Sequence, residues 1–142
     1  MKKSEPKKKG SGVSKTASIK KKASLGKRNR QRGNEYERRI VNEMNELGFN
    51  MVTSRSESKN ADNNKVDLID LSHKCPVQIQ IKRTTSTPQY LKIREETTVP
   101  DEEFALIWNK QKNVNGRFLS EGEVVILDKE MFYKLIAPFA NE

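Results

Sequence analysis

The sequence predicts an α/β fold in which helices flank a central sheet, preceded by a disordered basic arm. Three observations lead to this prediction. Two runs rich in Val, Ile and Leu, residues 66–71 and 77–83, flank a short turn-prone segment, which is the pattern of a β-hairpin. Helical and strand patterns lie on both sides of this hairpin. The net positive charge of the chain lies in its first 32 residues.

The charge distribution separates an arm (residues 1–31) from a body (residues 32–142). Residues 1–32 carry 13 Lys and Arg against Glu5 alone, whereas the rest of the chain carries 15 basic and 18 acidic residues. The arm is poor in large apolar side chains, so we expect it to be disordered in isolation. Its lysine clusters are suited to bind nucleic-acid phosphates. The candidate DNA contacts are Lys20, Lys21 and Lys22. The alternatives are a solubilising tail or a nuclear import signal.

The bulk composition excludes several classes of protein. The length of 142 residues suits one domain with a modest core. No apolar run approaches the roughly 20 residues needed to cross a bilayer, and the basic N-terminus lacks the apolar segment of a signal peptide. Cys75 is the sole cysteine, which excludes an intrachain disulfide and a cysteine-based zinc cluster. These features predict a soluble, intracellular protein, either cytoplasmic or associated with the nucleoid.

Residues 34–48 carry the pattern of an amphipathic helix. Its apolar positions recur at intervals of four, four and three: Tyr36, Ile40, Met44 and Leu47. We expect Asn34 to cap its start and Gly48 to end it. Glu37 borders the apolar face, and the ordinary role of such a glutamate is a favourable interaction with the helix dipole.

A short strand at 49–53 follows the helix, and a polar loop follows the strand. Arg55 and Lys59 in this loop are suited to bind phosphates; the alternative is a mobile, solvated loop.

The second run of the hairpin places Gln80 and Lys82 on one face. Alternate residues of a strand point to opposite sides, and the aliphatic residues between them point to the core. Asp67 falls within the otherwise apolar first run, where a bare carboxylate would be costly to bury. An acid that faces an oxygen ligand and a lysine suits the binding of a divalent cation against a phosphodiester. The alternative is an ordinary solvent-exposed face of the sheet, with Asp67 capping a turn.

The rest of the chain completes the α/β pattern. The predicted elements are a short helix at 89–96, a buried strand at 104–108, a loop at 110–116 and a last strand at 122–127. Asp128 is expected to cap a closing helix over residues 129–137. Its inward-facing side chains are expected to be Met131, Phe132, Leu135 and Ile136.

This order of elements resembles the PD-(D/E)XK nuclease superfamily, and within it the archaeal-type Holliday junction resolvases. The resemblance covers residues 32–94 and rests on five matches: Gly33, Glu37 with Arg38, Gly48-Phe49, Asp67 opening the second strand, and Gln80-Ile81-Lys82 in the third. It implies a restriction-endonuclease-like mixed sheet flanked by helices. The sequence departs from the family at Val66, where a proline is usual, and at Gln80, where the family carries a glutamate. A neutral amide removes one negative charge from the cation site and should weaken magnesium binding.

The resemblance also implies an activity, namely cation-dependent hydrolysis of DNA phosphodiesters. Glu37, Asp67 and Gln80 would bind Mg²⁺ or Mn²⁺, and Lys82 would orient the attacking water or balance charge on the phosphate. The backbone carbonyl of Ile81 is a further candidate ligand. Arg55, Lys59, Arg83 and the arm would hold the DNA backbone without sequence preference. Resolvases act on branched DNA as symmetric homodimers, because paired nicks need two sites related by a two-fold axis. A nuclease of this small size suits a virus or phage.

Two other functions remain open on sequence grounds. One is a catalytically impaired nuclease-fold protein that binds DNA without cutting it, which the Gln80 substitution invites. The other is a small basic structural protein whose arm binds nucleic acid and whose body is only an anchor.

Overall fold

The computed structural model describes residues 15–54, 66–97 and 103–141, with side chains described from residue 26 onward. Its helices and strands are α1 (Lys15–Glu46), β1 (Met51–Thr53), β2 (Leu68–Asp70), β3 (Gln78–Thr84), α4 (Tyr90–Glu96), β4 (Phe104–Val114), β5 (Arg117–Leu127), α5 (Lys129–Ile136) and the short 3-10 helix η1 (Ala137–Asn141). The chain divides into two compact units, Met1–Gln31 and Arg32–Glu142. In the described residues, no helix is long and apolar enough to span a membrane.

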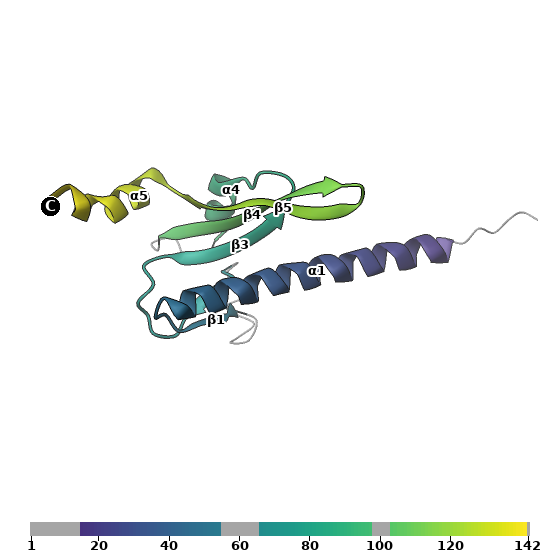
Figure 1. Ribbon diagram of the computed structural model, residues 1–142, viewed down its shortest axis with the longest axis horizontal. Helices are drawn as coiled ribbons and strands as arrows, with labels where there is room; N and C mark the ends of the chain where they lie inside the picture. Colours follow the sequence, from purple (N-terminus) through teal and green to yellow (C-terminus); the bar gives the residue numbers. More distant parts are fainter. Residues whose placement is uncertain (1–14, 55–65, 98–102, 142) are drawn as a thin grey trace, which may run out of the picture. The chain divides into compact units, whose positions relative to one another are not determined.

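The second unit is built on a five-stranded mixed sheet with the strand order β1-β2-β3-β4-β5 (Figure 1). β1, β2 and β3 are joined by antiparallel pairing, and so are β4 and β5. β3 and β4 are parallel, so the chain must cross over between them, and α4 lies in that crossover. This arrangement confirms the predicted α/β fold with a restriction-endonuclease-like mixed sheet and the predicted hairpin.

The two faces of the sheet are covered by different helices. On one face, Tyr36 and Ile40 of α1 pack with Met51, Leu68, Ile79 and Ile81. On the other face, Tyr90 of α4 packs with Phe104, Leu106 and Trp108. The alternation of β3 therefore assigns Ile79 and Ile81 to the α1 face, and Gln80 and Lys82 to the α4 face.

The start of α1 differs from the prediction. The helix begins at Lys15 and not at Asn34, so it includes residues 15–31 of the predicted arm. The expected disorder of this arm in isolation stays a prediction. The segment is rich in Lys, Arg, Ala and Gln, which are good helix formers, and it contains no proline. A single Gly33 costs only about 1 kcal/mol within a helix, which is too little to start a new one. Residues 1–14 of the arm lie outside the described residues.

The end of α1 confirms the role predicted for Gly48. Gly48 has a φ of 108°, its N–H donates to the carbonyl of Asn45, and the N–H of Phe49 donates to the carbonyl of Met44. These two bonds form the Schellman motif, which satisfies carbonyls at the end of a helix. Leu47, however, is 77% exposed, so the apolar face of α1 covers the sheet for one turn less than its sequence pattern predicts.

β4 and β5 are longer than predicted, and the loop expected at 110–116 shrinks to a turn at Asn115-Gly116. Both turn residues have positive φ, 52° and 81°. This backbone matches a two-residue type I′ hairpin, for which Asn-Gly is the preferred sequence. The polar residues of 110–114 therefore belong to a strand, because the tight turn keeps the two chains paired to its end.

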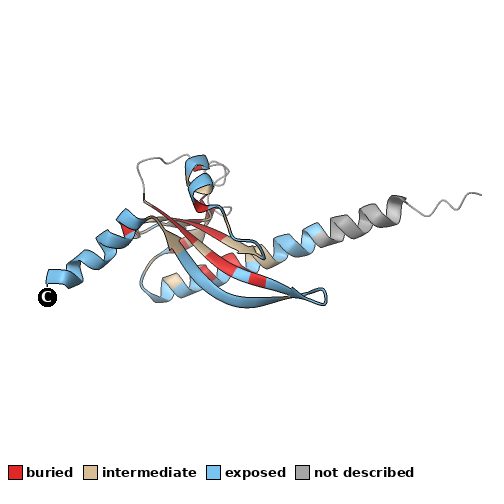
Figure 2. Cartoon of the chain, turned by 90° about the horizontal axis from the view of Figure 1, so that it is seen from above, coloured by how far each residue is buried: buried red, intermediate tan, exposed pale blue. Residues whose placement is uncertain are grey.

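Asp128 caps α5 as predicted, since its Oδ1 accepts the N–H of Met131 at 2.8 Å. Only Met131 is buried, whereas Phe132, Leu135 and Ile136 are 49%, 45% and 43% exposed. The prediction that these three face inward is wrong. Helical periodicity places them on one face, but α5 extends away from the sheet (Figure 2), and its second turn contacts the described part of the body through the ion pair of Lys134 with Glu103.

Candidate active site

Asp67 links β1, β2 and β3 at the start of the hairpin. Its N–H donates to the carbonyl of Ile79 at 2.9 Å, and its carbonyl accepts the N–H of Ser54 at 2.8 Å. Its carboxylate Oδ2 accepts the backbone N–H of Ile81 at 2.7 Å. Because Ile81 stands between Gln80 and Lys82, the Asp67 carboxylate lies beside the segment that carries both side chains. The structure thus places the Asp67 carboxylate against the backbone of the strand that carries Gln80 and Lys82.

Gln80 is the most unusual of these residues. It is 7% exposed, and its side-chain Oε1 is buried without a hydrogen-bond partner in the part of the chain that the structure describes. A buried acceptor left unsatisfied costs about 1–3 kcal/mol. Such an atom is suited to receive a donor or a cation from outside the chain. The side chains of Asp67 and Gln80 both carry oxygen atoms, the kind of ligand that Mg²⁺ prefers.

Lys82 has a neighbour that the sequence did not predict. In the parallel pairing of β3 and β4, Lys82 lies next to Trp108. The indole Nε1 of Trp108 donates to the side-chain oxygen of Thr84 at 3.1 Å, which fixes the ring along β3. The sequence predicted Trp108 only as part of a buried strand, because the register between two distant strands cannot be read from local pattern.

Glu37 lies on α1 and not on the hairpin that carries the other candidate metal ligands. It is 8% exposed and follows Tyr36 on α1, the helix that packs on the Ile79 and Ile81 face. It is therefore supplied from the side of the sheet opposite to Gln80 and Lys82. Its participation in a common site with Asp67 stays a prediction. Within the described residues, no group of three His, Cys, Asp or Glu side chains could hold a metal ion.

The predicted DNA-binding residues fall into three groups. Arg83 follows Lys82 and so points to the α1 face, where its Nη1 donates to the carbonyl of Arg32 at 3.3 Å and its Nε is buried without a partner in the described chain. Arg55 and Lys59 lie outside the described residues. Lys20, Lys21 and Lys22 lie within α1, in the part whose side chains are not described.

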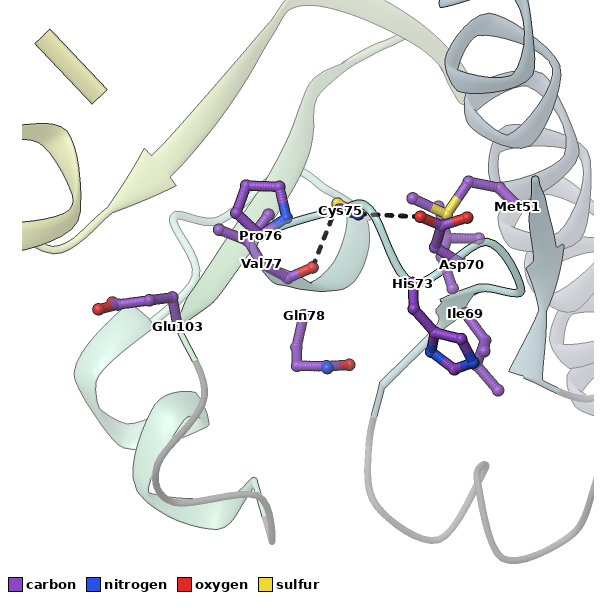
Figure 3. Close-up of a pocket in the computed structure, with 10 residues that line it drawn as sticks. Met51, Ile69, Asp70, His73, Cys75, Pro76, Val77, Gln78 and Glu103 are labelled. Atoms are coloured by element: carbon purple, nitrogen blue, oxygen red, sulfur yellow. Dashed lines mark hydrogen bonds between the residues drawn. The ribbon is translucent and has the colours of Figure 1, made fainter. Parts of the chain in front are cut away.

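A separate hollow of about 570 Å³ lies beside the turn that joins β2 to β3. Figure 3 shows Gln78 in the middle of this hollow, with His73 and Glu103 on either side. The thiol of Cys75 donates to the carbonyl of Val77 at 3.4 Å, and burial raises the pKa of this thiol. A raised pKa keeps the thiol protonated, which is typical of a buried cysteine with a structural role.

Asp70 holds the same turn together and is not available as a metal ligand. Its Oδ1 accepts the N–H groups of Asn50 and Ser72 and the hydroxyl of Ser72, and its Oδ2 accepts the N–H groups of Lys74 and Cys75. Desolvation by burial raises the pKa of this carboxyl. The hydrogen bonds from Ser72, Cys75, Asn50 and Lys74 outweigh it and hold the pKa well below its usual range.

This network predicts a pH-dependent contribution to stability. Because the folded-state pKa of Asp70 is lowered, its contribution is complete above the unfolded value of about 3.8 and is lost as the pH falls towards the folded value. Below pH 3.8, the free energy of unfolding of the wild type should fall more steeply than that of Asp70→Asn. Urea titrations at a series of pH values measure both slopes, and equal slopes would show that Asp70 does not contribute in this way.

A comparison with protein-family models gives a match. The family model for the archaeal Holliday junction resolvase (hjc) matches residues 28–130, a range that contains Glu37, Asp67, Gln80 and Lys82. Searches of curated proteins and of solved structures give no match. The matched range covers most of the chain, including the sheet and the helices on both of its faces. The chain therefore belongs to the archaeal Holliday junction resolvase family of the PD-(D/E)XK nuclease superfamily.

Proposed function

We propose that this chain is a divalent-cation-dependent endonuclease that cuts branched DNA, acting as a homodimer. The observation that carries the proposal is the buried Oε1 of Gln80, which has no partner in the described chain and lies on the strand that holds the Asp67 carboxylate. Family membership supports a nuclease that acts on Holliday junctions. A two-fold dimer supplies the two symmetric nicks that resolution of a junction needs.

The residues present suit Mg²⁺ or Mn²⁺. Asp67 and Gln80 offer oxygen atoms, and Glu37 is the further carboxylate proposed for the same cation. The chemistry that such a cation supplies is the activation of water near neutral pH and the polarisation of the scissile phosphate. The Ile81 N–H holds the Asp67 carboxylate in one orientation, so this ligand needs little reorganisation when a cation binds.

The charge and position of Lys82 favour a role in the hydrolysis step. It lies between the Asp67 contact and Trp108 on the α4 face of the sheet. An ammonium there stabilises the additional negative charge that develops on the phosphate during hydrolysis, or orients the attacking water. Because the positive charge acts mainly in the transition state, its removal should lower the rate of cleavage more than the affinity for DNA.

A second candidate function is a nuclease-fold protein that binds branched DNA without cutting it. The neutral amide of Gln80 and the lack of a three-acid cluster in the described residues favour this alternative. A nicking assay on an immobile four-way junction separates the two functions. Our proposal predicts nicks in Mg²⁺ or Mn²⁺ and none in EDTA, whereas binding without nicks in either cation would support the alternative.

We further propose that residues 1–31 form a basic DNA-binding arm. Removal of residues 1–28 should weaken junction binding and flatten its dependence on salt, because fewer counterions are released. Fluorescence anisotropy at several salt concentrations measures both quantities. A matched variant with Lys20, Lys21 and Lys22 changed to Gln keeps the length of the chain and should lower the slope of log K against log salt by roughly 2–3. An unchanged slope in both variants would assign the arm another role.

A further inference from the structure

The hairpin of β4 and β5 extends beyond the sheet as a two-stranded ribbon. β3 pairs with β4 only as far as Thr84 opposite Lys110, whereas β4 and β5 stay paired to Val114 opposite Arg117. Figure 1 shows the hairpin running past the end of β3, and Figure 2 shows that this part is largely exposed. An extra residue in β5, Glu121, forms a bulge where the ribbon leaves the sheet. A bulge of this kind bends a strand and redirects its side chains.

One face of the ribbon makes contacts within the protein. Asn109 is 1% exposed, and its Oδ1 accepts hydrogen bonds from the Gln111 side chain at 3.1 Å and from the Ser120 hydroxyl at 2.7 Å. On the same face, the Arg32 guanidinium lies 4.7 Å from the centre of the Phe118 ring. The Arg32–Phe118 contact joins the ribbon to α1, whereas the hydrogen bonds of Asn109 stay within the ribbon. Within the described residues, the opposite face of the ribbon is left uncovered.

The uncovered face continues the sheet face that holds Lys82. Strand alternation puts Lys110 and Lys112 on the same side of β4 as Trp108, which lies beside Lys82. Lys112 pairs with Leu119, and Val114 pairs with Arg117 on this face. All four of these side chains are exposed. Lys110 forms an ion pair with Glu121 at 2.9 Å, so Lys112 and Arg117 carry the net positive charge towards the tip.

The spacing of these cations matches a duplex laid along the ribbon. At about 3.3 Å per residue, Lys112 lies roughly 13 Å along β4 from Trp108, and the pair of Val114 and Arg117 lies roughly 20 Å away. DNA advances about 3.4 Å per base pair, so roughly 20 Å corresponds to about six base pairs. Cations at these distances can meet phosphates of the same duplex, while Leu119 and Val114 offer apolar contacts to its sugars.

We propose that the exposed face of this ribbon, formed by Lys112, Val114, Arg117 and Leu119, is a second contact for duplex DNA. It holds the sugar-phosphate backbone of one arm about six base pairs from the phosphate at Lys82, without reading the sequence. This inference rests on the proposed function of the Asp67, Gln80 and Lys82 site, because that site fixes where the scissile phosphate lies.

The test compares two double variants with the same change in charge. Lys112→Gln with Arg117→Gln removes two cations from the ribbon, and Lys74→Gln with Lys129→Gln removes two exposed cations from other parts of the surface. Binding of the full-length protein to a four-way junction is measured by anisotropy in EDTA over a range of salt. The ribbon variant should bind about tenfold more weakly and lose roughly 2 from the salt slope, whereas the control should keep both. Cleavage of the junction by the control variant should match that of the wild type.

Arm length supplies a second readout that a folding defect would not reproduce. The difference between the wild type and the ribbon variant should disappear on junctions whose arms are shorter than about six base pairs. Equal binding by the two double variants, or a ribbon defect of the same size on short arms, would overturn the inference. A third outcome would also overturn it: the ribbon variant is a monomer that binds the junction normally, whereas the wild type is a dimer. The ribbon would then be an interface between two copies of the chain. A wild type that binds the junction without cutting it would overturn the proposed activity and leave the ribbon comparison valid.

Discussion

Asp67→Asn is expected to bind a four-way junction as well as the wild type does and to cut it at least about 100-fold more slowly. The substitution removes the carboxylate charge proposed to bind the cation. It keeps an oxygen that can accept the N–H of Ile81, which Oδ2 accepts at 2.7 Å. Catalytic and structural roles of Asp67 are thereby separated. Single-turnover cleavage and anisotropy on the same junction measure rate and affinity.

Asp67→Ala is the matched variant that loses both roles. It leaves the Ile81 N–H without its acceptor, which costs about 1–3 kcal/mol where water cannot reach it. We therefore expect Asp67→Ala to have a lower melting temperature than Asp67→Asn, with cleavage lost in both. If both variants cut the junction at the wild-type rate, Asp67 does not belong to a catalytic site.

Gln80→Glu is expected to increase the affinity of the site for its cation. The new carboxylate adds one negative charge to the Asp67 site, and hard cations bind more tightly as the number of charged oxygen ligands rises. The concentration of Mn²⁺ or Mg²⁺ that gives half-maximal cleavage should fall by about tenfold. The same change places a carboxylate at a position that is 7% exposed, so it should lower the melting temperature in EDTA.

Thermal melting gives a readout of this prediction that is independent of activity. Added Mn²⁺ should raise the melting temperature of Gln80→Glu more than that of the wild type, because the cation compensates the buried charge. Gln80→Met is the matched control, with similar volume and no oxygen atom. It should be insensitive to Mn²⁺ and no less stable than the wild type, because it removes an acceptor that has no partner in the described chain. Equal responses of all three proteins to Mn²⁺ would place the cation elsewhere.

Features encoded by neighbouring residues could be predicted from the sequence. The alternation around Gln80 predicted β3 and the face that holds Lys82, and the positions of Gly48 and Asp128 predicted a helix end and a helix start. The Asn115-Gly116 turn was also present as a local signal, and reading it would have extended β4 and β5 to their observed length. The start of α1 was placed too late, because the helix-forming residues before Gly33 continue the helix to Lys15.

Features that depend on contacts between distant segments could not be predicted. The neighbourhood of Lys82 and Trp108 follows from the parallel register of β3 and β4, which no local pattern encodes. The pairing of Asp67 with the Ile81 N–H follows from how the hairpin closes. Periodicity gave the apolar face of α5 correctly, but the exposure of Phe132 depends on what surface lies opposite to it.

The central claim is that Asp67, Gln80 and Lys82 form a cation-dependent site for phosphodiester hydrolysis. Cleavage of an immobile four-way junction by the wild type and by Lys82→Ala, at equal occupancy of the DNA and in Mg²⁺, tests it most directly. The account predicts that the wild type introduces nicks that EDTA abolishes, and that Lys82→Ala binds the junction but leaves it intact. Nicking by Lys82→Ala at the wild-type rate, or nicking by the wild type in EDTA, would contradict it.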